Sequence, residues 1–227
     1  MADASHELRS PLAAMRSEID VTLRTQDLPT AARDALESTR DDVDQLSRTV
    51  DDLLTLARAD EQGLRPVAEP LDLRQLASVT AASMGSLARE RGVTIVVDGP
   101  EVFGLGDDRW LRQALRNLLD NAIRHSPPTG AVTIRTSNAA ATAIVCVTDD
   151  GPGIPVELQE RVFDRFFRVD EARTPGTRAG SGIGLSITRE IARAHGGEAW
   201  VDSRPSGGSA VSISLPAATH SPRPDRA

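Results

Sequence analysis

The sequence predicts an α+β protein in which an antiparallel helical hairpin precedes a sandwich of helices and strands. Three observations predict this class. A heptad repeat runs through the first 57 residues with one break, a turn-rich stretch follows it, and helical and strand patterns then alternate up to residue 215. We therefore expect a hairpin domain over residues 1–62, an α/β domain over 63–216, and a disordered tail over 217–227.

The hairpin is predicted by a seam of apolar and small residues spaced alternately by four and three positions. The seam of the second helix comprises Ala32, Leu36, Thr39, Val43, Leu46, Val50, Leu53 and Ala57, and that of the first comprises Leu8, Leu12, Met15, Ile19 and Thr22. Between them, TQDLPT supplies a proline and a helix cap. Two helices alone cannot bury a seam on both, so we expect a homodimer that forms a four-helix bundle. Packing against the rest of the same chain is the alternative.

The α/β domain is predicted to mix helices with strands that need not be parallel. We expect helices over 71–91, 107–125 and 182–194, and strands over 93–97, 131–136, 142–148, 198–203 and 210–215.

Composition excludes several classes of function. The net charge of −7 argues against a general nucleic-acid binder, which needs clustered positive charge. A single cysteine excludes an internal disulfide and a Cys-rich metal site. No apolar run approaches the roughly 18–20 residues of a membrane span, and no signal peptide is visible.

Two stretches of the α/β domain carry polar groups suited to a metal and a base. In NLLDN, Asn117 and Asn121 share one face of a helix, and amide oxygens suit Mg²⁺, although such a pair also occurs on solvated faces. DDGPGIP follows an apolar strand, and its Asp149 can accept a hydrogen bond from an amine such as that of adenine. An ordinary Asp-Gly turn has the same composition.

Two further stretches suit phosphate. ERVFDRFFRVD joins three phenylalanines to arginines that can bind phosphate bidentately, although aromatic residues at this spacing are also typical of a core. In GSGIGLSI, glycines open an apolar helix, and the N–H groups of such a helix start can bind phosphate. The polar segment EARTPGTRAG before it is typical of a mobile lid. At the end of that helix, His195 is explained by helix capping.

A fifth stretch, SHELRSPL, places a histidine beside an acid on the first helix. Taken in order, SHELRSPL, NLLDNAIRHS, DDGPGIP, FDRFFR and GSGIGL resemble the motifs of the sensor histidine kinases of two-component systems. The resemblance spans nearly the whole chain, from His6 to about Leu215. It implies a dimerisation and phosphotransfer hairpin joined to an ATP-binding α/β sandwich of the Bergerat type, the fold shared with gyrase.

By position in these motifs, the resemblance implies that His6 accepts a phosphoryl group and that Glu7 takes its proton or polarises its ring. It implies ATP and Mg²⁺ as cofactors, with Asn121 and Asn117 holding the metal and Asp149 binding the adenine amine. Arg168 would contact the γ-phosphate. The other implied nucleotide-binding residues are Arg124, His125, Gly151, Gly153, Gly180, Gly182, Gly184 and Leu185.

Three positions depart from the family pattern. Arg124 and His125 stand where the family commonly has Lys and Tyr. A phosphate would then be bound by a rigid guanidinium, and adenine would stack on a smaller ring than that of Tyr. Ser10 stands where the family often has Thr, at a position associated with phosphatase activity. Its hydroxyl leaves that activity open.

The resemblance implies autophosphorylation of His6, then transfer to an aspartate of a response regulator receiver domain. The alternative is a catalytically degenerate scaffold, also dimeric, that only binds nucleotide. ATP-hydrolysing relatives of gyrase use a glutamate where this chain has Asn117. We further expect the cytoplasmic portion of an inner-membrane sensor, with its membrane segment upstream of His6, and no nucleic-acid partner. Phosphorylation within or between subunits stays open.

Overall fold

A computed structural model describes residues 2–25, 27–169, 181–204 and 207–218. For residues 2–6, 9, 58, 60, 62 and 203 it describes the backbone alone. The chain divides into two compact units, Met1–Gln62 and Gly63–Ala227. Within the described residues, no helix is long and apolar enough to cross a bilayer.

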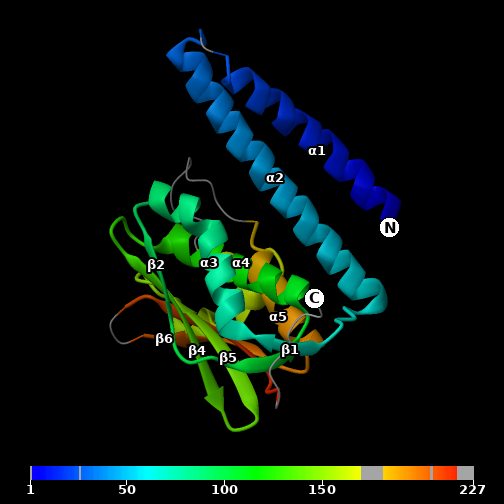
Figure 1. The fold of residues 1–227 in the computed structure, drawn as a ribbon, viewed down its shortest axis with the longest axis vertical. Helices are drawn as coiled ribbons and strands as arrows, with labels where there is room; N and C mark the ends of the chain where they lie inside the picture. The colour runs from blue at the N-terminus through cyan, green and yellow to red at the C-terminus, as the bar shows by residue number, and fades with distance from the viewer. Residues whose placement is uncertain (1, 26, 170–180, 205–206, 219–227) are drawn as a thin grey trace, which may run out of the picture. The chain divides into compact units, whose positions relative to one another are not determined.

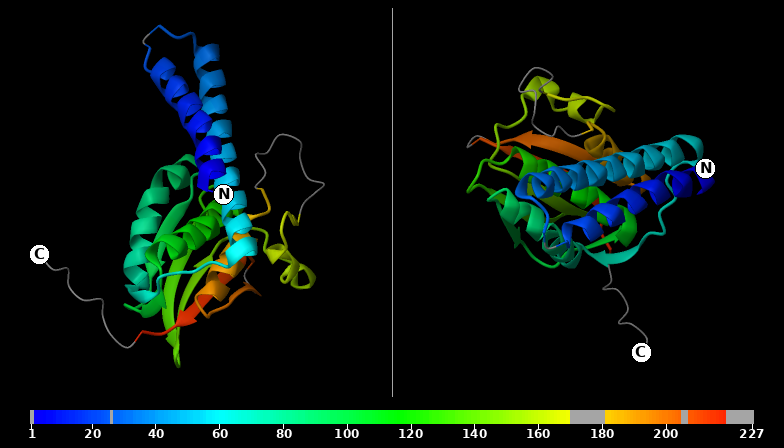
Figure 2. Two further views of the ribbon diagram at one scale, coloured as in Figure 1. Left: turned by 90° about the vertical axis from the view of Figure 1, so that its right-hand side faces the viewer. Right: turned by 90° about the horizontal axis from the view of Figure 1, so that it is seen from above.

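The first unit is an antiparallel helical hairpin of α1 (Ala2–Leu23) and α2 (Thr30–Gln62), which lie side by side in Figures 1 and 2. Arg33 closes the turn, because its guanidinium donates to the carbonyl of Leu23 at 3.0 Å and to that of Thr25 at 3.3 Å. The hairpin core comprises Leu12, Ile19 and Val43, with Leu23, Leu36 and Val50 packed against it.

The heptad seam divides into two sets of residues, each with a seven-residue spacing. One set packs inside the hairpin and is buried or half-buried: Leu12, Ile19, Leu36, Val43 and Val50. Ala57, at the same spacing, is half-buried. The other set is exposed apart from the half-buried Ala32, and its exposed members are Leu8, Met15, Thr22, Thr39, Leu46 and Leu53. Each helix therefore uses one heptad position within the hairpin and leaves the other open to solvent.

The second unit is an α/β sandwich built on a five-stranded sheet of order β2-β4-β5-β7-β6. Its strands are β2 (Thr94–Asp98), β4 (Ala131–Ala139), β5 (Thr142–Thr148), β6 (Ala199–Ser203) and β7 (Ser209–Pro216). The pair β2 and β4 is parallel, whereas the other neighbours are antiparallel. The predicted α+β class is confirmed, with both parallel and antiparallel pairing in one sheet.

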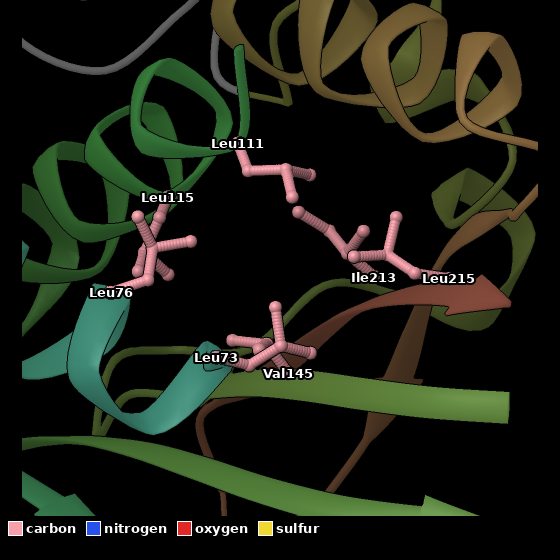
Figure 3. Close-up of a pocket in the computed structure, with 7 residues that line it drawn as sticks. All are labelled: Leu73, Leu76, Leu111, Leu115, Val145, Ile213 and Leu215. Atoms are coloured by element: carbon pink, nitrogen blue, oxygen red, sulfur yellow. The ribbon is translucent and has the colours of Figure 1, made fainter. Parts of the chain in front are cut away.

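Helices α3 (Leu73–Glu90), α4 (Asp108–His125) and α5 (Gly184–Ala194) lie over one face of this sheet (Figure 1). Their apolar stripes contribute many of the fully buried side chains of the core: Leu73, Leu115, Leu118, Leu119, Ile123, Ile187 and Ile191. A small cavity in this layer is lined only by aliphatic side chains from α3, α4, β5 and β7 (Figure 3). It belongs to the hydrophobic core, because polar groups are absent from its lining.

Two short strands differ from the predicted elements. β1 (Glu69–Asp72) pairs with β3 (Phe103–Gly106) in a separate two-stranded sheet, so the helix predicted from residue 71 is wrong at its start. It begins at Leu73, because Asp72 is the N-cap and its Oδ1 accepts from the N–H groups of Arg74 and Gln75. The sequences EPLD and FGLG contain Pro and Gly, which are depleted in strands.

Candidate active site

One stripe of α4 carries the predicted metal-binding and nucleotide-binding residues. Asn117 and Asn121 are half-buried and lie one turn apart, while the opposite face of the helix packs into the core. The Asn117 amide nitrogen donates to the carbonyl of Gly184 at 3.1 Å. Its oxygen is therefore the atom of that amide available to a cation.

The last turn of α4 brings Arg124 and His125 to the same end of the helix. Arg124 pairs with Asp120, and its side chain is 18% exposed. Its positive charge thus has a partner within the helix, and only part of it is available to a phosphate. The His125 side chain is exposed, and its charge acts on the carboxylate of Asp149.

Asp149 lies at the end of β5 with one carboxylate oxygen already satisfied. Its Oδ1 accepts from the N–H of Gly151 at 2.8 Å and from the N–H of Ser209 at 3.3 Å. Both of these backbone N–H groups bind Oδ1, so Oδ2 can accept from the exocyclic amine of a bound base.

Burial raises the pKa of the Asp149 carboxyl above its ordinary value of 3.8. The hydrogen bonds from Gly151 and Ser209 and the charge of His125 oppose this rise. A partly desolvated carboxylate makes stronger hydrogen bonds than one in water, which suits it to recognise an amine.

Glycines allow the turn after Asp149 to approach two other segments. A side chain at Gly151 would stand 2.8 Å from the carbonyl oxygen of His125, so the absence of one lets the turn lie against the end of α4. Gly153 has a φ of +82° and faces the carbonyl of Gly208. The turn is thereby held between α4 and the β6–β7 connection.

The FDRFFR stretch is tied to α5 by backbone and stacking contacts. The Phe166 N–H donates to the carbonyl of Gly182 at 2.9 Å, and the Arg189 guanidinium stacks on the Phe163 ring at 3.9 Å. Only Phe163 of the three phenylalanines is buried, whereas Phe166 is 62% exposed. They do not form one core cluster.

The predicted nucleotide-binding and metal-binding residues, all in the second unit, fall into three groups. The structure joins α4, the turn after Asp149 and the start of α5, where Leu185 is half-buried. Arg168 is exposed on the segment that contacts Gly182. Gly180 lies outside the described residues.

His6 and Glu7 lie on the other unit. The backbone of His6 is helical, in the second turn of α1, and Glu7 is exposed beside it. Pro11 lies within the same helix, where it removes one backbone donor.

Gly208 and Ser209 hold Asp149 from the other side, and none of the sequence motifs predicts this contact. Ser209 accepts from the Asp149 N–H at 3.0 Å and donates to its Oδ1, and an added side chain at Gly208 would overlap the Asp149 carbonyl. The signal that could have found them is the GGS stretch before the last strand, because adjacent glycines there indicate a close backbone approach.

Two family models match the chain. Residues 106–219 match the histidine kinase-, DNA gyrase B-, and HSP90-like ATPase family, and residues 1–62 match the His Kinase A (phospho-acceptor) domain. The second match covers the helical hairpin, and the first covers most of the α/β sandwich.

Curated relatives are similar over most of the chain. The sensor protein kinase PmrB of Pseudomonas aeruginosa is 35% identical over 198 residues, 86% of this chain and 40% of the relative. The signal transduction histidine-protein kinase/phosphatase MprB of Mycolicibacterium smegmatis is 37% identical over 225 residues, 95% of this chain and 44% of the relative. The chain thus spans less than half the length of these relatives.

Solved structures agree with both matches. The full-length structure of ShkA in complex with AMPPNP has a TM-score of 0.77 at 28% identity, covering 97% of this chain and 46% of that one. The mycobacterial sensor histidine kinase MprB has a TM-score of 0.57 at 33% identity, covering 66% of this chain and 98% of that one. With its phospho-acceptor hairpin, its ATPase sandwich and its five motifs in order, this chain belongs to the sensor histidine kinases of two-component systems.

Proposed function

We propose that the chain is the phosphotransfer and catalytic core of a sensor kinase, which phosphorylates its own His6 from ATP and passes the group to an aspartate of a response regulator. The observation that carries this proposal is the geometry of Asp149, with one oxygen bound by backbone N–H groups and the other available to adenine. The related ShkA structure contains the ATP analogue AMPPNP.

Asn117 and Asn121 fit a magnesium ion bound with the nucleotide. Their amide oxygens are hard ligands, and Mg²⁺ commonly takes few protein ligands and shares phosphate oxygens. When bound, the ion would neutralise charge on the phosphates. The chain's own contribution is to hold both amides on one face of α4, with Asn117 fixed by Gly184.

In the first chemical step, a ring nitrogen of His6 attacks the γ-phosphorus of ATP. A nitrogen–phosphorus bond forms, the bond from the γ-phosphorus to the bridging oxygen breaks, and ADP leaves. Glu7 would take or polarise the ring proton. Arg168 would stabilise charge on the transferring group. In the second step, the phosphoryl group passes to the carboxylate of the regulator.

We infer that the core is a homodimer through the hairpin. The exposed set of heptad residues, which includes Met15, Leu46 and Leu53, is apolar enough to form the inner seam of a four-helix bundle. The names of the relative PmrB and of the solved mycobacterial MprB structure support a sensor protein, and we extend this to the cytoplasmic portion of an inner-membrane sensor.

We include dephosphorylation of the regulator in the proposal. The relative MprB is named a kinase/phosphatase, and Ser10 lies one helical turn after His6 with its side chain exposed. A hydroxyl there can orient a water molecule towards a phosphoaspartate.

Incubation with γ-labelled ATP and Mg²⁺ tests the proposed function. We expect label on the chain that is stable in alkali and labile in acid, and that leaves when a cognate receiver domain is added. Release of free phosphate without labelled protein would show an ATP hydrolase instead. Nucleotide binding with neither label nor phosphate release would show the scaffold.

A further inference from the structure

Arg204 lies outside every motif of the nucleotide site but contacts its central residue. It directly follows β6, and its Nη1 donates to the main-chain carbonyl of Asp149 at 2.7 Å. The same nitrogen lies 3.4 Å from Oδ1 of Asp150. The Arg204 side chain is 32% exposed, so this charge-assisted hydrogen bond is partly shielded from water.

Ser209, the first residue of β7, binds two other polar groups of Asp149. The Asp149 N–H donates to Ser209, and the Ser209 N–H donates to Oδ1 of Asp149. Gly208, which has no side chain, lets the connection lie directly against the Asp149 carbonyl. With Arg204 on that carbonyl, the N–H, the carbonyl and one carboxylate oxygen of Asp149 are bound by two residues, Arg204 after β6 and Ser209 at the start of β7.

Asp150 completes the arrangement on the far side of the peptide. Its Oδ2 accepts from the N–H of Ala131 at 2.9 Å, at the first residue of β4. Arg204 therefore bridges two successive residues, and Asp150 is itself anchored to the sheet. A rotation of the 149–150 peptide would break the hydrogen bond between the guanidinium and the Asp149 carbonyl.

We propose that Arg204 is a positioning residue for adenine recognition: it fixes the peptide after Asp149, and thereby aims Oδ2 at the exocyclic amine. This rests on the proposed binding of adenine by Asp149. A base that lacks the amine makes no use of Oδ2, so its affinity does not depend on the direction in which that oxygen points.

Paired nucleotides separate this role from a general structural one. The full chain is titrated with ADP and with purine riboside 5′-diphosphate, which lacks only the 6-amino group, for the wild type, Arg204→Met and Arg204→Lys. We expect Arg204→Met to weaken the binding of ADP about three- to tenfold, as for loss of one hydrogen bond. The affinity for the amine-free nucleotide should not change. Arg204→Lys retains one charged donor, so its affinity for ADP should lie between those of the wild type and Arg204→Met.

Arg135→Met is the matched control, because Arg135 is an exposed arginine on the same sheet that pairs with Asp98. It should change neither affinity. An equal loss for both nucleotides in Arg204→Met, or no loss for ADP, overturns the proposal. If Arg204→Met does not fold, the same comparison between Arg204→Lys and wild type decides. Equal wild-type affinity for the two nucleotides contradicts the role of Asp149 itself, and so identifies failure of the proposed function.

Discussion

The side-chain amide of Asn117 donates to the carbonyl of Gly184 across a 3.1 Å hydrogen bond. This bond joins the face of α4 that carries the proposed metal ligands to the first residue of α5, 67 positions later. The same carbonyl also accepts from the hydroxyl of Thr188 at 2.9 Å. Asn117 thus has a structural role in addition to its proposed role in metal binding, whereas the side chain of Asn121 has no hydrogen bond to a described residue.

Replacement of the two asparagines should therefore affect the stability of the protein differently, but should affect its labelling from ATP in the same way. We expect Asn117→Ala to lower the free energy of unfolding by about 1 kcal/mol, the typical worth of one hydrogen bond, and Asn121→Ala to change it by less than about 0.5 kcal/mol. Both variants should lose Mg²⁺-dependent labelling from ATP. Urea denaturation provides the first measurement, and equal stability losses would contradict the distinction.

Gly182 and Gly184 form a second matched pair. Gly182 has a φ of +69°, and an added side chain would stand 2.9 Å from the backbone of Phe166. At Gly184 the nearest atom would be an ordinary 3.5 Å away, on Asn117. We expect Gly182→Ala to lower the free energy of unfolding by roughly 2 kcal/mol or more. Gly184→Ala should stay within about 1 kcal/mol of wild type, because alanine favours the helix. A larger loss for Gly184→Ala in urea denaturation would be the contrary result.

Replacement of Asp149 by asparagine should weaken nucleotide binding without reducing the stability of the protein. Asp149→Asn retains an oxygen for Gly151 and Ser209 but presents an amide donor to the adenine amine, so we expect nucleotide affinity to fall about 10- to 100-fold. Because burial raises the pKa of Asp149 in the folded state, its ionisation costs stability above that pKa and the cost is relieved as the pH falls. The substitution should therefore not reduce the free energy of unfolding at pH 7.

The same pKa sets a pH dependence for binding. The carboxylate must be ionised to accept the amine bond at full strength, so nucleotide affinity of the wild type should weaken as the pH falls through the raised pKa, above 3.8. Titration calorimetry at several pH values measures this. Asp149→Asn should lack the dependence, and a variant that kept it would show that another group titrates.

The exposed heptad residues give a prediction about assembly. Leu46 is 53% exposed on the seam of α2, while Val21 is 63% exposed on α1 but lies off the seam. We expect Leu46→Asp to raise the dimer dissociation constant at least about tenfold, since burying one leucine is worth about 1.5–3 kcal/mol. Val21→Asp should leave it unchanged. Sedimentation equilibrium compares them, with circular dichroism as a check that the hairpin remains helical.

The elements best predicted from sequence are those with strong periodicity. In α2 and α4, the spacing of the apolar residues along the sequence predicts the helix. The order of the five motifs along the chain indicates the family. Long-range contacts have no such local signal. The ring of His195 was predicted only to cap its helix, but its Nε2 also accepts from the N–H of Asp107, 88 residues away.

The parts of the structure that could not be predicted from the sequence all depend on long-range contacts. β1 and β3 form through pairing with each other, against the preferences of their own residues. Arg204 is one arginine among many, and only the fold brings it to the carbonyl of Asp149. The exposure of Phe166 depends on its φ of 63° and its bond to Gly182, neither of which follows from the spacing of the aromatic residues.

We expect His6 to be the residue that receives the phosphoryl group. Peptide mapping by mass spectrometry at alkaline pH, after incubation of the chain with ATP and Mg²⁺, locates that group among the four histidines. We expect the phosphoryl group on the peptide that contains His6, and on no peptide of His6→Ala. A phosphoryl group on His125, on His195 or on a hydroxyl side chain, undiminished in His6→Ala, would contradict it.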